Sequence, residues 1–514
     1  MLLKLLCTAI FFIRTLNKES AAILLNLIIR YMNTLKSFLF FIAGICLLLS
    51  CSKSDQLTPG LSDLSGDNLK GQDIGCGKVF VVKPNGTDDT GPLQQAFENA
   101  KATGSGSVVK LVEGNYYIGF IEIHEFFGSF TGAGKGKTVI TAKTGLDCDA
   151  IVNQGLSPIL IGFVGGNILM CDMTLKMPEE AICSNGWGIG ALLMFSDFNS
   201  IYNSVNNYIN ATVNNVGFIG HEFAQWSYSC WTGLAGTCNF QVPPGVTRSH
   251  IDLKVTNCTF NDFGWGTQIN GIKKGKSIIG TKNNGNVFTN IYEPVVFHEC
   301  INDVKISVVG NRFNIPEGWY YGIDVDSYPS GWWIEEPLTK PVICNIEENE
   351  FNDQGGDEAI WLHDNEFALH PEDNIAMIVT VNNNRINMSA GANAGIVMDE
   401  MQNPVLRNNT FTGIGNYGMY AFCDLPGIIS KNGFILGNNF TQATFTNASI
   451  YLDYSTQNWT VIGNLNATVT NLGVDNVIKN AFFHSGDDRP GKHFPNPEDH
   501  MNFIKGKFRS YHLN

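Results

Sequence analysis

Aspartate and histidine recur at one position of a four-residue strand motif in the second half of the chain. Copies of the motif begin at residues 267, 295, 323, 360, 396, 419 and 450. From the second copy on, the first and third residues are apolar, so a β-strand turns them inward and turns the other two outward. The fourth residues are Asn270, His298, Asp326, His363, Asp399, Phe422 and Asp453. The second residues are Gln268, Val296, Asp324, Trp361, Val397, Tyr420 and Tyr451.

Parallel stacking of these strands, about 4.8 Å apart, would collect each set into a column on one face. Carboxylates and imidazoles beside aromatic rings suit carbohydrate, because rings stack on sugar faces and carboxylates exchange protons. Asp326 and Asp399 would lie two strands, or about 9–10 Å, apart at the backbone. That is near the roughly 6.5–9.5 Å between the carboxyl groups of inverting glycosidases. We predict an acid/base pair, with His363 between the carboxyl groups to tune them or to take a proton itself.

Further residues around the pair are predicted to bind substrate. They are Asp324, Trp361, His298, Glu299, Glu400, Tyr420 and Tyr451. The alternative is that these positions are polar only because they face water. A solvated face would mix in lysine and arginine, which the two columns lack, and like charges stacked across strands are destabilising. This favours the functional interpretation.

Elimination and simple binding are the other functions that the residues allow. A pectate-type lyase needs Ca²⁺ to neutralise a uronate, and a lysine or arginine as base. The carboxylates that could hold Ca²⁺ are Asp324, Asp326, Glu299 and Glu400. The columns hold no basic residue, since Lys273 and Lys274 lie one strand end away and Arg407 lies on a turn, which favours hydrolysis without a cofactor. A non-catalytic, adhesin-like glycan-binding protein is the third candidate.

A short repeat explains how the columns could be built. Its apolar anchors, spaced 25 to 38 residues apart, are Phe260, Phe288, Phe313, Phe351, Ile386, Phe411 and Phe440. The repeats contain β-branched and aromatic runs broken by Gly and Asn, which predicts a β-solenoid. An Asn stands two positions before most anchors, at Asn286, Asn311, Asn349, Asn384, Asn409 and Asn438. We expect these asparagines to adopt the left-handed region and to form a side-chain ladder; Cys258 takes this place in its repeat.

A helix is expected to cap the open end of the solenoid. Residues 90–100 place Leu93, Ala96, Phe97 and Ala100 on one face, with Asp89 or Thr90 as N-cap. An uncapped end would expose unpaired strand edges.

The opening of the solenoid resembles a known family. Three segments carry the resemblance, which begin at Asn85 (NGTDDTGPLQQAF), Gly104 (GSGSVVKLVEGNYYI) and Gly132 (GAGKGKTVI). They are similar to the start of right-handed parallel β-helix proteins of the pectate-lyase superfamily, which include polygalacturonase-like hydrolases and phage tailspikes. The resemblance implies an all-β, single-stranded right-handed parallel β-helix over residues 77–480. The catalytic motifs of polygalacturonases are missing from the repeats, so no catalytic residue follows from it.

Composition limits the partners. The 514 residues carry a net charge of −14 and are 44% hydrophobic, which excludes a disordered chain and argues against nucleic-acid binding. We expect a monomer that acts on a polysaccharide. Long insertions at 178–210 and 221–248 are expected to line the binding face, the second with a disulfide between Cys230 and Cys238.

The N-terminus predicts export and a lipid anchor. Residues 38–49 are apolar but too short to span a bilayer comfortably. They lead into Leu-Leu-Ser-Cys51, which resembles the lipobox of bacterial lipoproteins, with Met32 as the true start. We therefore expect a signal peptide over 1–51, a polar tether over 52–76 and a C-terminal cap over 481–514. The anchor would hold the protein at the bacterial outer membrane, on its periplasmic or cell-surface side, and is its predicted membrane contact.

Replacing the lipobox cysteine tests this localisation. Cys51→Ala removes the thiol that is acylated, so the protein should move from the membrane fraction to the soluble fraction. Fractionation followed by immunoblotting measures this, with Cys46→Ala as control. Retention of Cys51→Ala in the membrane would contradict the prediction.

Overall fold

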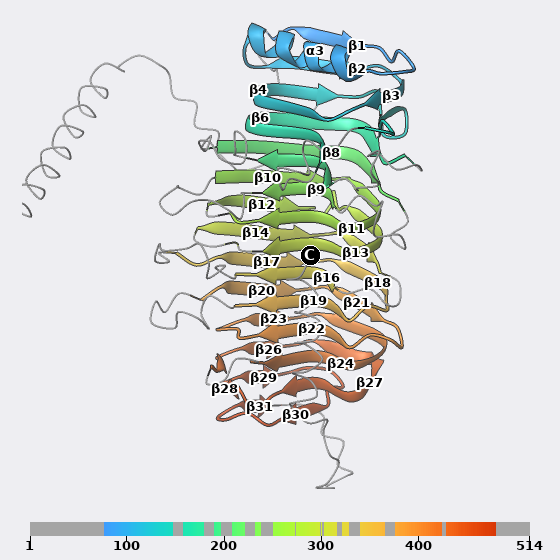
Figure 1. The fold of residues 1–514 in the computed structure, drawn as a ribbon. Helices are drawn as coiled ribbons and strands as arrows, with labels where there is room; N and C mark the ends of the chain where they lie inside the picture. The colour runs from blue at the N-terminus through green and yellow to red at the C-terminus, as the bar shows by residue number, and fades with distance from the viewer. Residues whose placement is uncertain are drawn as a thin grey trace, which may run out of the picture. The chain divides into compact units, whose positions relative to one another are not determined.

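The computed structural model describes residues 77–146, 158–178, 190–196, 208–221, 232–237, 250–272, 274–298, 300, 303–315, 321–327, 340–364, 376–423 and 428–479. The chain divides into the units Met1–Gln72 and Asp73–Asn514, and all described residues belong to the second. In this unit, parallel strands follow one another in successive coils (Figure 1). The prediction of an all-β parallel β-helix is confirmed. Among the described residues, no helix is long and apolar enough to cross a membrane.

The described strands form three faces, which we call the first sheet, the anchor sheet and the site sheet. The first sheet contains β1 (Val79–Val82), β2 (Ser107–Leu111), β10 (His250–Thr256), β12 (Gly275–Ile279), β14 (Val304–Val309), β17 (Ile343–Glu347), β20 (Ile378–Asn382), β23 (Val405–Arg407), β26 (Phe434–Leu436), β29 (Thr460–Ile462) and β31 (Val477–Lys479). The anchor sheet contains β3 (Gly114–Ile118), β5 (Thr138–Ala142), β15 (Arg312–Asn314), β18 (Glu350–Gln354) and β21 (Arg385–Met388). The site sheet contains β7 (Ala191–Ser196), β9 (Thr232–Thr237), β16 (Tyr321–Asp326), β19 (Glu358–His363), β22 (Ala394–Asp399) and β30 (Val469–Asn471).

Longer strands turn a corner and pass from one sheet into the next. They are β4 (Ile121–Thr131), β6 (Ile159–Lys176), β8 (Tyr208–Ile219), β11 (Thr259–Asn270), β13 (Val287–His298), β24 (Thr410–Phe422) and β27 (Asn439–Leu452). A separate short pair joins β25 (Ser430–Lys431) to β28 (Thr456–Gln457). Four of these strands run from the anchor sheet into the site sheet: β11, β13, β24 and β27. The strand register set in the anchor sheet therefore continues into the site sheet.

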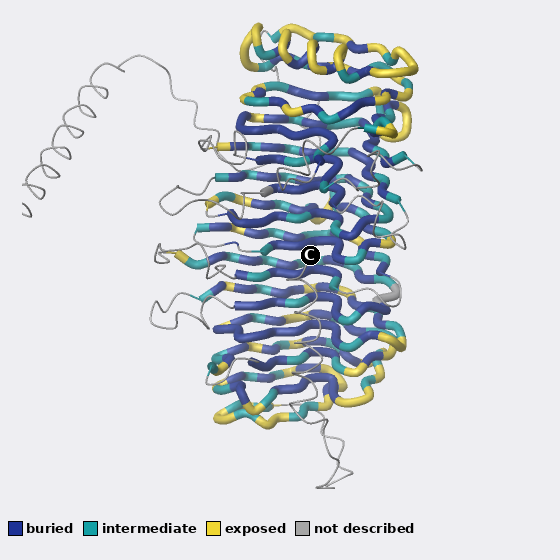
Figure 2. Tube along the Cα trace, in the orientation of Figure 1, coloured by how far each residue is buried: buried dark blue, intermediate teal, exposed yellow. Residues whose placement is uncertain are grey.

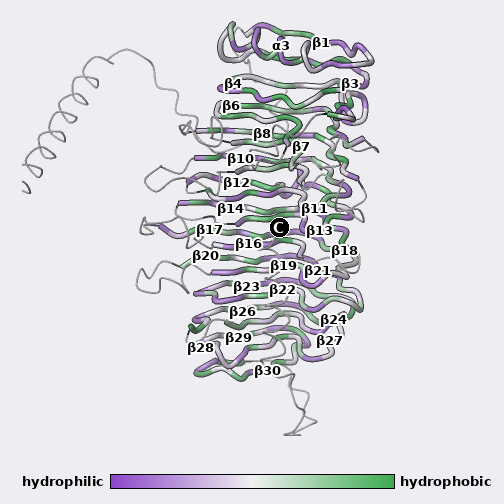
Figure 3. Tube along the Cα trace, in the orientation of Figure 1, coloured by the Kyte–Doolittle hydropathy of each residue, from purple (hydrophilic) through white to green (hydrophobic). Residues whose placement is uncertain are grey.

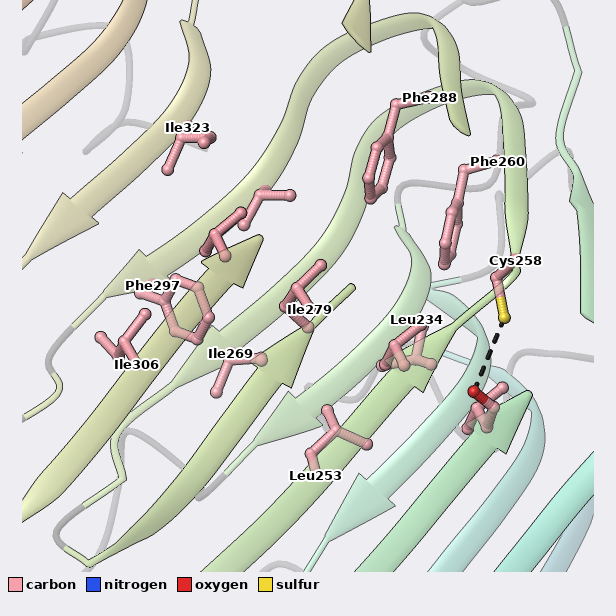
Figure 4. Packing of buried hydrophobic residues seen from close by; sticks show 14 of the residues in the cluster. Leu234, Leu253, Cys258, Phe260, Ile269, Ile279, Phe288, Phe297, Ile306 and Ile323 are labelled. Atoms are coloured by element: carbon pink, nitrogen blue, oxygen red, sulfur yellow. Dashed lines mark hydrogen bonds between the residues drawn. The ribbon is translucent and has the colours of Figure 1, made fainter. Parts of the chain in front are cut away.

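Stacked phenylalanine rings fill the interior beneath the anchor sheet. Phe218, Phe260, Phe288, Phe313 and Phe351 stack with ring centroids 4.6 to 5.1 Å apart and planes within 2–12° of parallel. Figure 4 shows Phe260 and Phe288 side by side with Cys258 and aliphatic residues around them. All the predicted anchors are buried, and the buried stretches continue from coil to coil (Figure 2). Cys258 and Cys300 are also buried.

The asparagine ladder is confirmed and is longer than expected. The side-chain amide of each Asn donates to the side-chain oxygen of the Asn one coil later, over 2.9–3.0 Å, from Asn286 to Asn464. The same oxygen accepts the backbone N–H of the preceding ladder Asn. Each amide also donates to a backbone carbonyl, such as that of Ile346 for Asn384. The ladder thus satisfies buried polar groups along one corner of the stack, from Asn286 to Asn464.

The expected left-handed backbone of the ladder asparagines is wrong. In most coils the residue before the ladder Asn has the positive φ, as in Gly310 (69°), Glu348 (55°) and Asn408 (55°). This preceding residue makes the corner, which leaves the ladder Asn free to direct its amide along the stack. Small or polar residues suit the left-handed region best.

The capping helix α3 (Thr90–Thr103) buries Leu93, Ala96, Phe97 and Ala100 against the first coil, as predicted. Asp89 is the N-cap residue, but its carboxylate accepts the backbone N–H groups of Asn85 and Tyr117 instead of one from the helix. Hydrophilic and hydrophobic residues alternate along most strands below it, which fits one face on the interior (Figure 3). The expected cap over 481–514 lies outside the described residues.

Removal of one ladder side chain should destabilise the stack. Asn384→Ala eliminates four hydrogen bonds and leaves the buried backbone N–H of Asn349 without its acceptor. We expect a loss of about 3 kcal/mol in the free energy of unfolding, measured by urea denaturation. Asn345→Ala, at a partly exposed position of β17, should change it by less than about 0.5 kcal/mol. Equal effects of the two substitutions would show that the ladder does not stabilise the fold.

Candidate functional site

The strand register brings together the two predicted columns of the site sheet. Asp326 of β16 pairs with His363 of β19, and His363 pairs with Asp399 of β22. In the neighbouring column, Asp324 pairs with Trp361. Farther along the stack, Tyr420 of β24 pairs with Tyr451 of β27. The alignment inferred from the sequence is thus the register of the structure.

Several side chains of these columns are buried although they point outward. Asp399, Asp324 and His363 retain only 3%, 6% and 9% of their accessible surface, and Tyr451 is also buried, whereas Asp326 is partly exposed. They lie on the outer side of the sheet, but side chains of adjacent columns pack and hydrogen-bond against one another. Trp361, Tyr417 and Tyr420 pack with Ala394, Val397 and Phe422 into an apolar cluster separate from the interior. Burial raises the energetic importance of each charge on this face.

The structure contains a third column on the same face that the four-residue sequence motif does not include. It comprises Trp265, Glu293, Tyr321, Glu358, Ala394, Tyr417 and Ala448. Glu293 accepts a hydrogen bond from the Trp265 indole over 2.6 Å, and Glu358 accepts one from the Asn393 side chain over 2.8 Å.

Glycine explains why this column was missed. In most coils a Gly follows the third-column residue, and a Cβ on Gly322 would lie 2.7 Å from the ring of Phe351. Gly395 and Gly418 approach the rings of Phe411 and Phe440 in the same way. This glycine turns toward the interior at the corner, which breaks strict alternation. The repeated Gly before the motif was the available signal.

His298 and Asp324 form an ion pair on this face. The His298 Nε2 atom lies 2.9 Å from Asp324 Oδ2. Burial disfavours protonation of His298, but the negative charges of Asp324, Asp326 and Glu293 outweigh it and raise its pKa to about 9. His298 is therefore an imidazolium at neutral pH. It supplies a positive charge among carboxylates in columns that lack lysine and arginine in the described strands.

His363 has the opposite character. Burial lowers its pKa to about 4, although Asp324 opposes the shift, and the charge of His298 lowers it further. Its Nδ1 atom lies 3.6 Å from Asp399 Oδ2, and its ring stacks on Trp361 with centroids 4.4 Å apart. A neutral imidazole therefore lies between the Asp326 and Asp399 strands at neutral pH.

The aromatic residues contact one another closely. Tyr420 stacks on Tyr417 and on Phe422, with centroids 5.0 and 4.7 Å apart, while Tyr451 meets it edge-on at 5.1 Å. The faces of the Tyr420 ring are therefore covered by its neighbours rather than open to a sugar. Tyr321 meets Trp361 edge-on at 4.3 Å and, with His363, holds the indole in place.

The remaining predicted residues fall outside this group. Glu400 is fully buried and follows Asp399 with a left-handed backbone, where it accepts from the Cys423 thiol. Glu299, Cys51, Cys230 and Cys238 lie outside the described residues, as do parts of both long insertions. Within the described part of the chain, no group of three or more His, Cys, Asp or Glu residues has a geometry that could hold a metal ion.

Comparisons with known proteins show similarity of backbone alone. No known family and no curated protein matches the chain. The A-module of the mannuronan C-5 epimerase AlgE6 of Azotobacter vinelandii is 13% identical, with 75% of this chain and 97% of that chain covered and a TM-score of 0.39. The catalytic domain of a GH87 α-1,3-glucanase in complex with nigerose is 11% identical, with 84% and 69% covered and a TM-score of 0.44. The Dettilon tailspike protein is 12% identical, with 77% and 68% covered and a TM-score of 0.40.

The two histidines should titrate on opposite sides of neutrality. We expect His298 to lose its proton near pH 9 and His363 to gain one only near pH 4. NMR titration of labelled histidine rings measures both, with assignment from His298→Gln and His363→Gln. Titration of both near the ordinary value of about 6.5 would contradict the electrostatics of the site.

The same shifts predict how stability depends on pH. Because the pKa of His298 is raised in the folded state, its contribution is present below about pH 6.5 and is lost as the pH rises toward 9. The pKa of His363 is lowered, so the unfolded state takes up the proton first and stability falls as the pH falls from about 6.5 toward 4. Each glutamine substitution should flatten its own side of the profile.

Proposed function

We propose that the site sheet binds a neutral polysaccharide and hydrolyses its glycosidic bonds, with Asp326 and Asp399 as the acid/base pair. The observation that carries the proposal is the register of Asp326, His363 and Asp399 on three adjacent strands beside Trp361. Two strand spacings separate the carboxyl-bearing backbones by about 9.6 Å. Side-chain rotation adjusts this toward the roughly 6.5–9.5 Å that lets a water molecule act in an inverting mechanism.

The surroundings suggest which carboxyl group has which role. Asp399 is buried beside the neutral imidazole of His363, so we assign it as the general acid toward the leaving oxygen. Asp326 is more exposed and interacts with the positive charge of His298, which favours the carboxylate that a general base requires. As the bond between the anomeric carbon and the leaving oxygen breaks, Asp399 gives its proton to that oxygen. Water attacks the anomeric carbon from the opposite side and gives its proton to Asp326.

Charge favours a neutral substrate over a uronate. Glu293, Asp324 and Glu358 add to the two catalytic carboxyl groups, and His298 is the nearby cation on these columns. A uronate polymer would therefore meet repulsion unless a metal ion neutralised it. Elimination and non-catalytic binding are the outcomes that would replace hydrolysis.

We also propose that the enzyme acts at the bacterial outer membrane, anchored through acylated Cys51. Support comes from the Leu-Leu-Ser-Cys51 sequence and the polar stretch that follows it. A tethered enzyme would meet polymers that are too large to enter the cell.

Isosteric substitution of the pair tests the catalytic proposal. Asp326→Asn and Asp399→Asn should each lower the turnover number by about 10²–10⁴-fold, because each removes a proton-transfer group. Asp453→Asn is the matched control and should retain activity. Asp453 directly follows the last paired residue of β27, one strand past Phe422 along the stack. Turnover is measured as new reducing ends released from a panel of neutral and uronate polysaccharides.

Folding and product chemistry complete the test. Because Asp399 is buried, circular dichroism and the urea midpoint must first show that its variant folds. Full activity in both variants would contradict the assignment. Products with unsaturated, ultraviolet-absorbing ends would replace hydrolysis by elimination, and binding without products would make the protein a glycan-binding module.

A further inference from the structure

Asp324 holds a buried carboxylate oxygen that has no hydrogen-bond partner among the described residues. Its Oδ2 atom pairs with the Nε2 atom of His298 over 2.9 Å. Its Oδ1 atom is buried and accepts no hydrogen bond from the residues that the structure describes. A buried, unsatisfied charged acceptor is costly, typically by about 1–3 kcal/mol or more. Such an atom in a candidate site indicates that a ligand supplies the missing donor.

Trp361 presents the complementary group one strand away. Its Nε1–H is buried and has no acceptor within the described part of the chain. Trp361 pairs in register with Asp324, so the two backbones lie about 4.8 Å apart. The stack on His363 and the edge contact with Tyr321 fix the plane of the indole. A charged acceptor and a neutral donor thus stand side by side without bonding to each other.

A hydroxyl group satisfies both atoms at once. It donates its proton to Asp324 Oδ1 and accepts from Trp361 Nε1 with one oxygen. A carboxylate would be repelled by Asp324, and an ammonium group could not accept from the indole. We infer that Asp324 and Trp361 form a hydroxyl-binding subsite for the sugar unit next to the cleaved bond. This inference rests on the proposed function.

The position of the subsite gives it a role in specificity. Asp324 precedes Asp326 by two residues on β16, and Trp361 precedes His363 by two residues on β19, so the subsite lies one column from the acid/base pair. Sites that hydrogen-bond a substrate hydroxyl reject analogues that lack it by up to about 10⁴–10⁵-fold. Sugars that are deoxygenated or O-acetylated at this position should therefore be poor substrates.

Binding measurements on the folded protein test the subsite. The probes are cello-, xylo-, manno- and laminari-oligosaccharides, titrated by calorimetry into Asp326→Asn, which binds without turnover. In this background Asp324→Asn should weaken binding by about 10- to 100-fold, because it removes a charged hydrogen bond. Trp361→Phe keeps an aromatic ring but loses the N–H, and should weaken binding by about 2- to 10-fold. Because both groups bind one hydroxyl, the double variant should lose less than the product of the single losses.

The matched control is Asp252→Asn on the first sheet. Asp252 forms a similar carboxylate–histidine pair with His250, with 3.1 Å between Oδ2 and Nε2. This pair lies on β10 of the first sheet, whereas the three columns lie on the site sheet. It should leave affinity unchanged. An O-methylated probe still accepts from Trp361 but cannot donate to Asp324, so it should bind the parent protein and Asp324→Asn with similar affinity.

Each other outcome overturns a defined part of the inference. One outcome is that the Asp326→Asn protein binds the probes and the wild type cleaves the polymer, but Asp324→Asn and Trp361→Phe bind as tightly as Asp252→Asn. A water molecule alone then occupies the place of the hydroxyl, and the proposed subsite is wrong. If the two losses multiply independently, the residues bind different ligand groups and the shared hydroxyl is wrong. If no probe binds and no polymer is cleaved, the proposed function and the subsite fall together.

Discussion

In-register stacking of parallel strands is the constraint on which everything else in this protein depends. Two columns of identical contacts hold it, the asparagine ladder at one corner and the phenylalanine stack beside it. A slip of one residue would break the ladder and turn every outward side chain of the site sheet toward the interior. The site is therefore positioned by residues such as Asn349 and Phe351, which take no part in its chemistry.

The same stacking forces unusual electrostatics on the site sheet. Residues one strand apart are held close together, so Asp324, Asp326 and Asp399 lie within one group with two histidines, and Asp324, Asp399 and His363 in it are buried. The surrounding negative charges keep His298 protonated, whereas His363, which is more deeply buried, remains neutral. Two chemically identical side chains two strands apart thus hold opposite protonation states at neutral pH.

The candidate site occupies a short part of the stack. In β6, β7 and β9 the same columns hold small or apolar residues such as Gly162 and Ala235, although β4 places Glu122 and His124 there, and in the later coils they hold Tyr420 and Tyr451. Charged groups gather on β13, β16, β19 and β22 between these regions. The tyrosines cover each other's faces, so their contribution is mainly to close one end of the charged group against solvent.

The sequence by itself determined the fold and the strand register, because a solenoid repeats local signals that need no knowledge of distant contacts. The anchors from Phe260 to Phe440, the ladder asparagines and the two outward columns all followed from spacing. Tertiary structure determined the features that no local sequence pattern encodes. It buried Asp399 and Asp324, set the opposite protonation states of His298 and His363, and placed Glu293 and Glu358 on the same face, in register with Trp265 and Ala394. Burial and charge depend on every neighbour in space, whereas periodicity depends only on neighbours in the chain.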